Sequence, residues 1–123
     1  MNIYNKAYGN VQENLPQFKN PEEALSFYLE GASKYLAKTA LAAKEERFED
    51  RSHHSDNALM IFNGILSHLE QSPPAEKEAI KTLSEYCTLM NSIIIKMNIK
   101  NDVTMAQNMA REVKKMSNHW KER

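Results

Sequence analysis

The sequence has few of the residues that interrupt or cross-link a chain. Its 123 residues include three glycines, four prolines and one cysteine. The prolines stand only at positions 16, 21, 73 and 74, and long stretches without breakers predict long helices. Because Cys87 has no second cysteine to pair with, an internal disulfide is excluded and a reducing compartment is indicated.

Net charge and long apolar runs are also missing. Sixteen basic residues balance sixteen acidic residues, so the composition does not indicate nucleic acid or an anionic membrane surface as a partner. No apolar run reaches the ~18 residues that would suggest a membrane span, and Met1–Asn10 is too polar for a signal peptide. We therefore expect a cytoplasmic protein without membrane insertion. Its length suffices for one domain with its own core.

Hydrophobic periodicity predicts four helical segments, and no period-2 run is long enough for a strand. Asn20-Pro21-Glu22-Glu23 is a strong helix start, with asparagine as the N-cap, proline in the first turn and Glu23 at the capping-box spacing. This first helix is expected to continue to about Arg47, before a charged break at Phe48–Arg51. The second helix is expected to end near residue 70. The third is expected to span about 75–98, and the last to follow a connection at 99–102.

Long helices joined by short loops predict an all-α fold, an antiparallel up-down four-helix bundle over residues 20–123. Residues 1–19 are expected to form an N-terminal arm or short helix that caps the bundle. The residues expected to face the core recur at helical spacing. They are Leu25, Tyr28, Leu29, Ala32, Tyr35, Leu36, Thr39, Ala40, Ala43, Ala58, Leu59, Ile61, Phe62, Ile65, Leu66, Leu69, Leu83, Tyr86, Cys87, Leu89, Met90, Ile93, Ile94 and Met97.

No residue pattern indicates catalysis. His53 and His54 are of a type that binds zinc or iron, but adjacent histidines point about 100° apart on a helix. No Glu-x-x-His pair recurs on two helices, as carboxylate-bridged bundles require. Cys87 lies on an apolar stripe, where burial raises the pKa of a thiol instead of activating it. We therefore expect no metal, no cofactor and no enzymatic activity.

Methionine is the unusual component of the composition. Methionine adapts its shape, so it fills irregular cores and also suits surfaces that accept a pliable partner. The groove between the last two helices is therefore a candidate docking surface for a partner helix. Ile95 and Ile99 form a second apolar patch behind the main stripe of their helix. The methionines of the last two helices are Met90, Met97, Met105, Met109 and Met116.

Several features occur together in a pattern that resembles the FliS family of flagellar export chaperones. A polar arm carries a tyrosine, Asn-Pro-Glu-Glu opens a long helix with Gly-Ala near its middle, and Met-Asn-Ile-Lys-Asn-Asp forms the later turn. The last helix closes on Trp-Lys-Glu, and the resemblance runs from about Ala7 to Glu122. The matching residues are Tyr8, Asn10, Pro21, Glu22, Glu23, Gly31, Ala32, Leu83, Met90, Asn98, Asp102 and Trp120.

The resemblance implies a bundle that holds the disordered C-terminal segment of flagellin in the cytoplasm. Such a chaperone prevents premature polymerisation and delivers its client to the type III export gate, without a cofactor. The arm around Tyr8 is implied to cover part of the site when the client is absent. The family usually has Leu-Tyr where this chain has Tyr28-Leu29 and Tyr86-Cys87, which rotates each tyrosine by about 100° around its helix.

Methionine content, the second apolar patch and the resemblance together define the expected partner-binding residues. A monomer or weak homodimer is expected. The alternative is a self-associating structural or adaptor bundle, in which the second patch closes a homodimer and no flagellin client exists. The expected partner-binding residues are Tyr8, Asn10, Tyr28, Tyr86, Met90, Ile94, Ile95, Ile99, Met105 and Met109.

Overall fold

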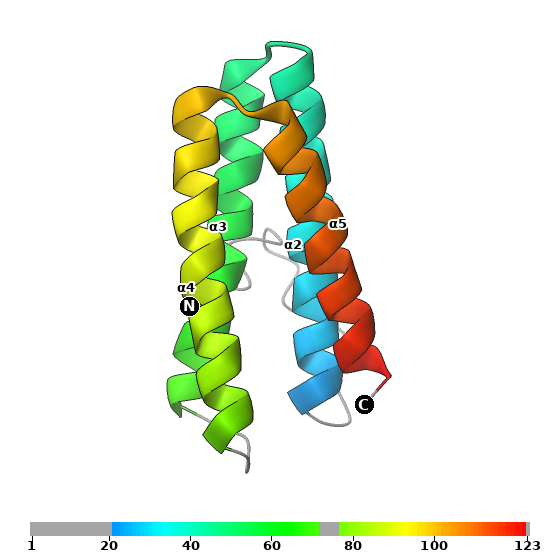
Figure 1. Ribbon diagram of the computed structural model, residues 1–123, viewed down its shortest axis with the longest axis vertical. Coiled ribbons are helices and arrows are strands. Elements are labelled where there is room, and N and C mark those ends of the chain that lie inside the picture. Colours follow the sequence, from blue (N-terminus) through cyan, green and yellow to red (C-terminus); the bar gives the residue numbers. More distant parts are fainter. Residues whose placement is uncertain (1–20, 72–76, 123) are drawn as a thin grey trace, which may run out of the picture.

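The computed structural model describes residues 21–71 and 77–122, and within these ranges the chain is helical with no strand. The four helices are α2 (Pro21–Lys44), α3 (Phe48–Gln71), α4 (Lys77–Lys100) and α5 (Val103–Lys121). They run alternately up and down (Figure 1). The expected all-α four-helix bundle is confirmed. The expected arm at residues 1–19, and Asn20 as the N-cap of the first helix, lie outside the described residues.

The first boundary differs from the expectation. Helix α2 ends at Lys44 instead of Arg47, and the residues expected to form a break, 48–51, are the first turn of α3. Two acidic residues, Glu49 and Asp50, lie in that first turn, where the positive end of the helix dipole stabilises carboxylates. The charged cluster is therefore a helix start and not an interruption.

Glu46 determines where α2 ends. Its φ of 57° places it in the left-handed region, and its N–H donates to Ala43 O at 3.2 Å. The next N–H, of Arg47, donates to Ala42 O at 2.8 Å. These two bonds form the Schellman arrangement that closes a helix C-terminus. Glycine or asparagine usually occupies the left-handed position, so a glutamate there does not indicate the end of a helix.

The turn between α4 and α5 consists of only two residues. Asn101 is left-handed at φ 50°, and the N–H of Asp102 donates to Met97 O at 3.1 Å. The Asp102 carboxylate then accepts from the Met105 N–H at 2.9 Å, so Asp102 is the N-cap of α5. The expected connection at 99–102 is shorter than expected, because α4 continues to Lys100.

The helices do not pack equally against one another. Helix α2 makes extensive contacts with both α5 and α3, whereas α4 packs on α3 and makes few contacts with α5. Helices α4 and α5 leave their shared turn and diverge along their length (Figure 1). Among the described helices, the bundle is therefore open along the side where α4 and α5 diverge.

Two buried serines fix the closest contact, between α2 and α5. The Ser26 hydroxyl donates to Ser117 O at 2.9 Å, and the Ser117 hydroxyl donates to Ser26 O at 2.7 Å. The two hydroxyl oxygens lie 3.3 Å apart. Reciprocal bonds from such short side chains to the opposite backbone require the two helix axes to approach closely.

The core agrees with the expected stripes except at one side of α4. Phe62, Leu29, Leu36, Ile61, Ile65 and Ile94 are fully buried. Tyr35, Leu59, Leu66, Tyr86 and Ile93 are partly buried and pack against the core. The expectation that Leu89 widens the buried stripe is wrong, because its side chain is 54% exposed. The sequence pattern missed Ser26, Ser33, Ser55 and Ser117, which are buried.

We expect Ser117→Leu to lower the free energy of unfolding by about 3 kcal/mol. Overpacking of this tight contact by the larger side chain costs about 1–3 kcal/mol of stability. The hydrogen bonds that are lost cost about 1 kcal/mol each. Urea denaturation measures the change. Asn118→Leu, at the exposed neighbouring position, is the control and should change stability by less than about 0.5 kcal/mol. Equal effects in the two variants would contradict the close approach at Ser117.

Candidate functional site

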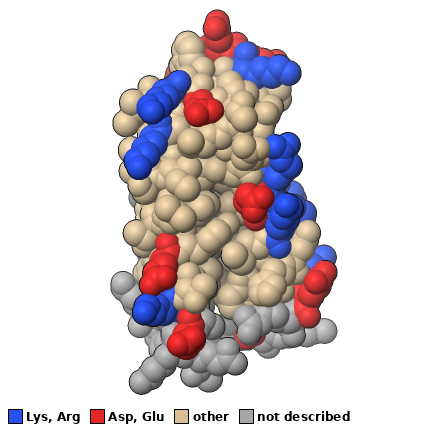
Figure 2. All heavy atoms as spheres, in the orientation of Figure 1, with Lys and Arg blue, Asp and Glu red and all other residues tan. Residues whose placement is uncertain are grey.

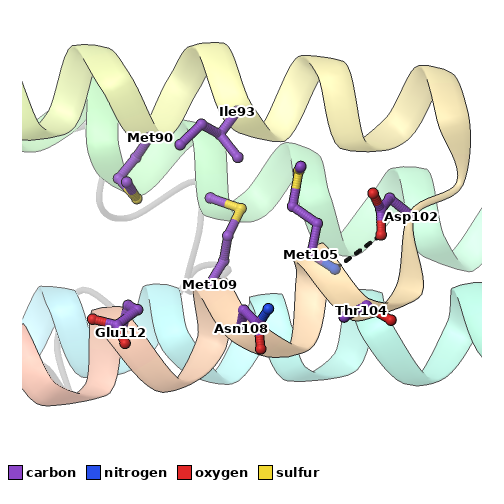
Figure 3. Close-up of a pocket in the computed structure, with 8 residues that line it drawn as sticks. All are labelled: Met90, Ile93, Asp102, Thr104, Met105, Asn108, Met109 and Glu112. Carbon is purple, nitrogen blue, oxygen red and sulfur yellow. Dashed lines mark hydrogen bonds between the residues drawn. The ribbon is translucent and has the colours of Figure 1, made fainter.

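The open side of the bundle contains a groove between α4 and α5. It encloses about 500 Å³. Side chains of α4 point across it toward those of α5, and the turn between the helices closes one end (Figure 3). It is lined by Met90, Ile93, Asp102, Thr104, Met105, Asn108, Met109 and Glu112.

Methionine side chains form most of the apolar surface of this groove. Met90 on α4 and Met109 on α5 are largely buried and make its floor, whereas Met105 is 37% exposed. Figure 3 shows Met105 and Met109 projecting from α5 toward α4. Because thioether chains are unbranched and flexible, such a surface can adjust to partners of different shape.

Charged groups lie mainly at the margins of this face. In Figure 2 the strip between α4 and α5 is largely free of Lys, Arg, Asp and Glu. Of the two carboxylates that line the groove, Asp102 is already engaged in capping α5, and Glu112 is an exposed side chain. The groove therefore suits an apolar partner and not an ionic one.

Tyr86 is a polar group buried beside the groove. Its ring packs edge-on against Phe62, with ring centroids 6.5 Å apart. Its hydroxyl is buried and has no hydrogen-bond partner among the described residues. Burial, with smaller contributions from Cys87 and Glu112, raises the pKa of Tyr86 to about 12. The hydroxyl therefore stays neutral and keeps a proton to donate.

The structure divides the expected partner-binding residues into groups. Met90, Met105 and Met109 come together in the groove. Ile94 is fully buried and Tyr28 nearly so, which makes both core residues. Tyr8 and Asn10 lie outside the described residues.

Ile95 and Ile99 are 53% and 78% exposed. Ile95 follows the groove residue Ile93 by two positions, about 200° around the helix, so this pair faces away from the groove. The expected residues therefore do not form one continuous surface.

Sequence reasoning missed the polar wall of the groove. Thr104, Asn108 and Glu112 follow one another at four-residue spacing on α5, beside the methionines. That spacing could have revealed them as one face, since residues four apart lie one above the other on a helix. Without the position of α4, however, the same face cannot be told from ordinary solvated surface.

The residues considered for metal binding or nucleophilic chemistry have structural roles in the bundle. No group of three His, Cys, Asp or Glu in the described ranges is placed to hold a metal ion. The His54 ring stacks on Tyr35 at 6.4 Å, and partial burial lowers its pKa. Cys87 is fully buried, which raises the pKa of its thiol to about 12. Within the same ranges, no helix is long and apolar enough to cross a membrane.

A helical bundle with a largely apolar, methionine-lined groove is typical of a class of protein that binds other polypeptides on its surface. Comparison with known families makes this class specific. The family described as "Flagellar protein FliS" matches residues 4–123. The chain belongs to the FliS family, whose members are chaperones of flagellar protein export. Searches of curated proteins and of solved structures gave no match.

We expect Tyr86→Phe to raise the free energy of unfolding by about 1 kcal/mol. The substitution removes a buried hydroxyl that has no partner among the described residues, and such a group costs about 1–3 kcal/mol. Urea denaturation at pH 8 measures the change. A raised pKa favours the neutral phenol in the fold, so the native protein should also lose stability between about pH 10 and 12, and the variant should lose less. If the variant were less stable, the inference that the Tyr86 hydroxyl makes no hydrogen bond would be wrong.

Proposed function

We propose that this protein is a cytoplasmic chaperone for flagellin. It binds the disordered C-terminal segment of flagellin, prevents premature polymerisation and delivers it to the flagellar type III export apparatus. Membership of the FliS family supports the export role. The observation that carries the proposal is the groove between α4 and α5, which presents methionine side chains along an open side of the bundle.

The groove has the chemistry to fold part of a disordered client. An amphipathic client helix would place its apolar side chains on Met90, Ile93 and Met109, and Met105 would adjust around them. Coupled folding of this kind buries about 1,000–3,000 Å² and offsets the client's ordering cost. Because the contact is mainly apolar, its affinity should depend little on salt.

The buried hydroxyl of Tyr86 would add a polar contact beside the groove. A client main-chain carbonyl at the edge of the groove would satisfy this donor, which has no partner in the described part of the chain. Tyr86→Phe would then stabilise the free chaperone and weaken the complex. Opposite signs of these two effects would identify a hydroxyl reserved for the client.

Two faces of α4 are available to a client that wraps around the bundle. Leu89 lies one turn before Ile93 and is exposed on the groove side, whereas Ile95 and Ile99 are exposed behind it. An extended segment of flagellin leaving the groove would pass around α4 to reach the isoleucines. This route connects the two separate patches with one client.

The alternative is a self-associating bundle without a flagellin client. Exposure of Ile95 and Ile99 favours it, because the same patch could close a homodimer. However, stable dimers bury about 1,200–2,000 Å² in total, and two isoleucines supply a small part of that area. Mass measurement at micromolar concentration separates the two: a tight dimer favours self-association, and a monomer favours the chaperone.

We expect a peptide of about 40 residues from the C-terminus of flagellin of the same genome to bind with sub-micromolar affinity and a negative heat-capacity change. The negative sign follows from burial of apolar surface. Isothermal titration calorimetry at several temperatures measures both quantities. Absence of binding by a folded monomer would reject the flagellin client and direct the search to other export substrates.

We expect Leu89→Asp combined with Met105→Asp to weaken binding of that peptide by at least about tenfold, since two apolar contacts are replaced by desolvated carboxylates. Ile95→Asp with Ile99→Asp tests the second face in the same titration. All four positions are exposed, so folding should be retained. The control is Leu41→Asp, an equally exposed leucine on α2. If either double variant binds the peptide with unchanged affinity, the face that it alters is not part of the client surface.

A further inference from the structure

A second groove lies on the other side of α5, between α5 and α2. It is a shallow, open groove with a volume of about 390 Å³, and it shares no lining residue with the groove described above. Helix α5 therefore separates the two, and an occupant of one leaves the other accessible. Its lining residues are Ser33, Lys34, Ala37, Ala110, Arg111, Lys114 and Lys115.

This groove is lined by small side chains and by basic ones. Ala37 on α2 and Ala110 on α5 supply small apolar side chains, and Ser33 beside them is buried. Small residues allow the backbone of a docking helix to come close. The four charged residues that line the groove are all cations, and basic side chains follow this edge of the molecule in Figure 2.

Only part of this positive charge is neutralised within the described ranges. Lys114 pairs with Glu30 at 2.6 Å, and Lys115 approaches Glu112 at 3.5 Å. Lys34 and Arg111 form no salt bridge within those ranges. Both pairs that exist are exposed, and exposed pairs contribute about 0–1 kcal/mol, so an incoming carboxylate could replace them.

The lowered pKa of Glu30 reflects the positive potential of this edge. Its pKa is lowered first by the hydrogen bond from Lys114, and further by the charges of Lys114, Lys34 and Lys121. Three lysines thus act on one carboxylate. Because the chain has no net charge, this excess of cations on one edge is a local feature that can steer an acidic partner.

We propose that the groove between α2 and α5 docks an acidic helical segment of a second protein while the groove between α4 and α5 remains free for the client. Carboxylates of that segment pair with Lys34 and Arg111, and small side chains rest on Ala37 and Ala110. Charge complementarity selects this occupant. A separate site of this kind would let a second protein recognise the chaperone with its client bound. It goes beyond the flagellin proposal and does not depend on it.

The test uses the full chain labelled with ¹⁵N and a synthetic helical peptide of about 20 residues that carries alanine and glutamate on one face. At low ionic strength, we expect amide shifts at Ser33, Ala37 and Ala110. Raising the salt from about 50 to 300 mM should weaken binding at least about tenfold. Lys34→Glu with Arg111→Glu should weaken it at least as much.

The matched control is Lys96→Glu with Lys100→Glu on α4, which makes the same change in net charge at two exposed lysines. It should change affinity less than about twofold. The proposal is overturned by three outcomes: no binding at low salt, equal loss in the control, or shifts spread over all basic surfaces. Tighter binding of a single-stranded oligonucleotide or of anionic vesicles would also overturn it. None of these results involves flagellin, so each can be told from failure of the flagellin proposal.

Discussion

The reciprocal hydrogen bonds between Ser26 and Ser117 decide the shape of this protein. They hold α5 against α2 at a distance that larger side chains would prevent. On its other side, α5 makes few contacts with α4. The groove lies on this second side of α5, and methionine side chains line it in place of the tightly packed side chains of a closed interface.

Helix α4 is attached to the rest of the bundle partly through polar side chains. Asn91 donates to Asn63 at 2.6 Å, Asn98 donates to the Ser55 hydroxyl at 2.7 Å, and Arg51 donates to Asn101 at 2.7 Å. All three bonds join α4 or its turn to α3. Directional bonds of this kind fix the register of α4 on α3, while its other side stays open to a partner.

Periodicity predicted the helices and most of the core, because burial on one face of a helix follows directly from the spacing of apolar residues. It failed where structure depends on other information. Glu46 adopts a backbone conformation that its identity does not indicate, so a boundary moved. Leu89 has the same apolar character as core residues, and only the way the helices pack leaves it exposed. Serines 26 and 117 look like surface residues in the sequence, so the tightest contact went unnoticed.

An open apolar groove also links the stability of this protein to the abundance of what binds it. Met105 and Leu89 are only partly buried, so the free bundle folds with part of its apolar surface still exposed to water. A ligand that binds only the native state adds RT ln(1 + [L]/Kd) to the free energy of unfolding, or about 2.7 kcal/mol at a hundredfold excess over Kd. The cellular lifetime of such a chaperone would then follow the supply of its client, which couples the two proteins without any dedicated regulator.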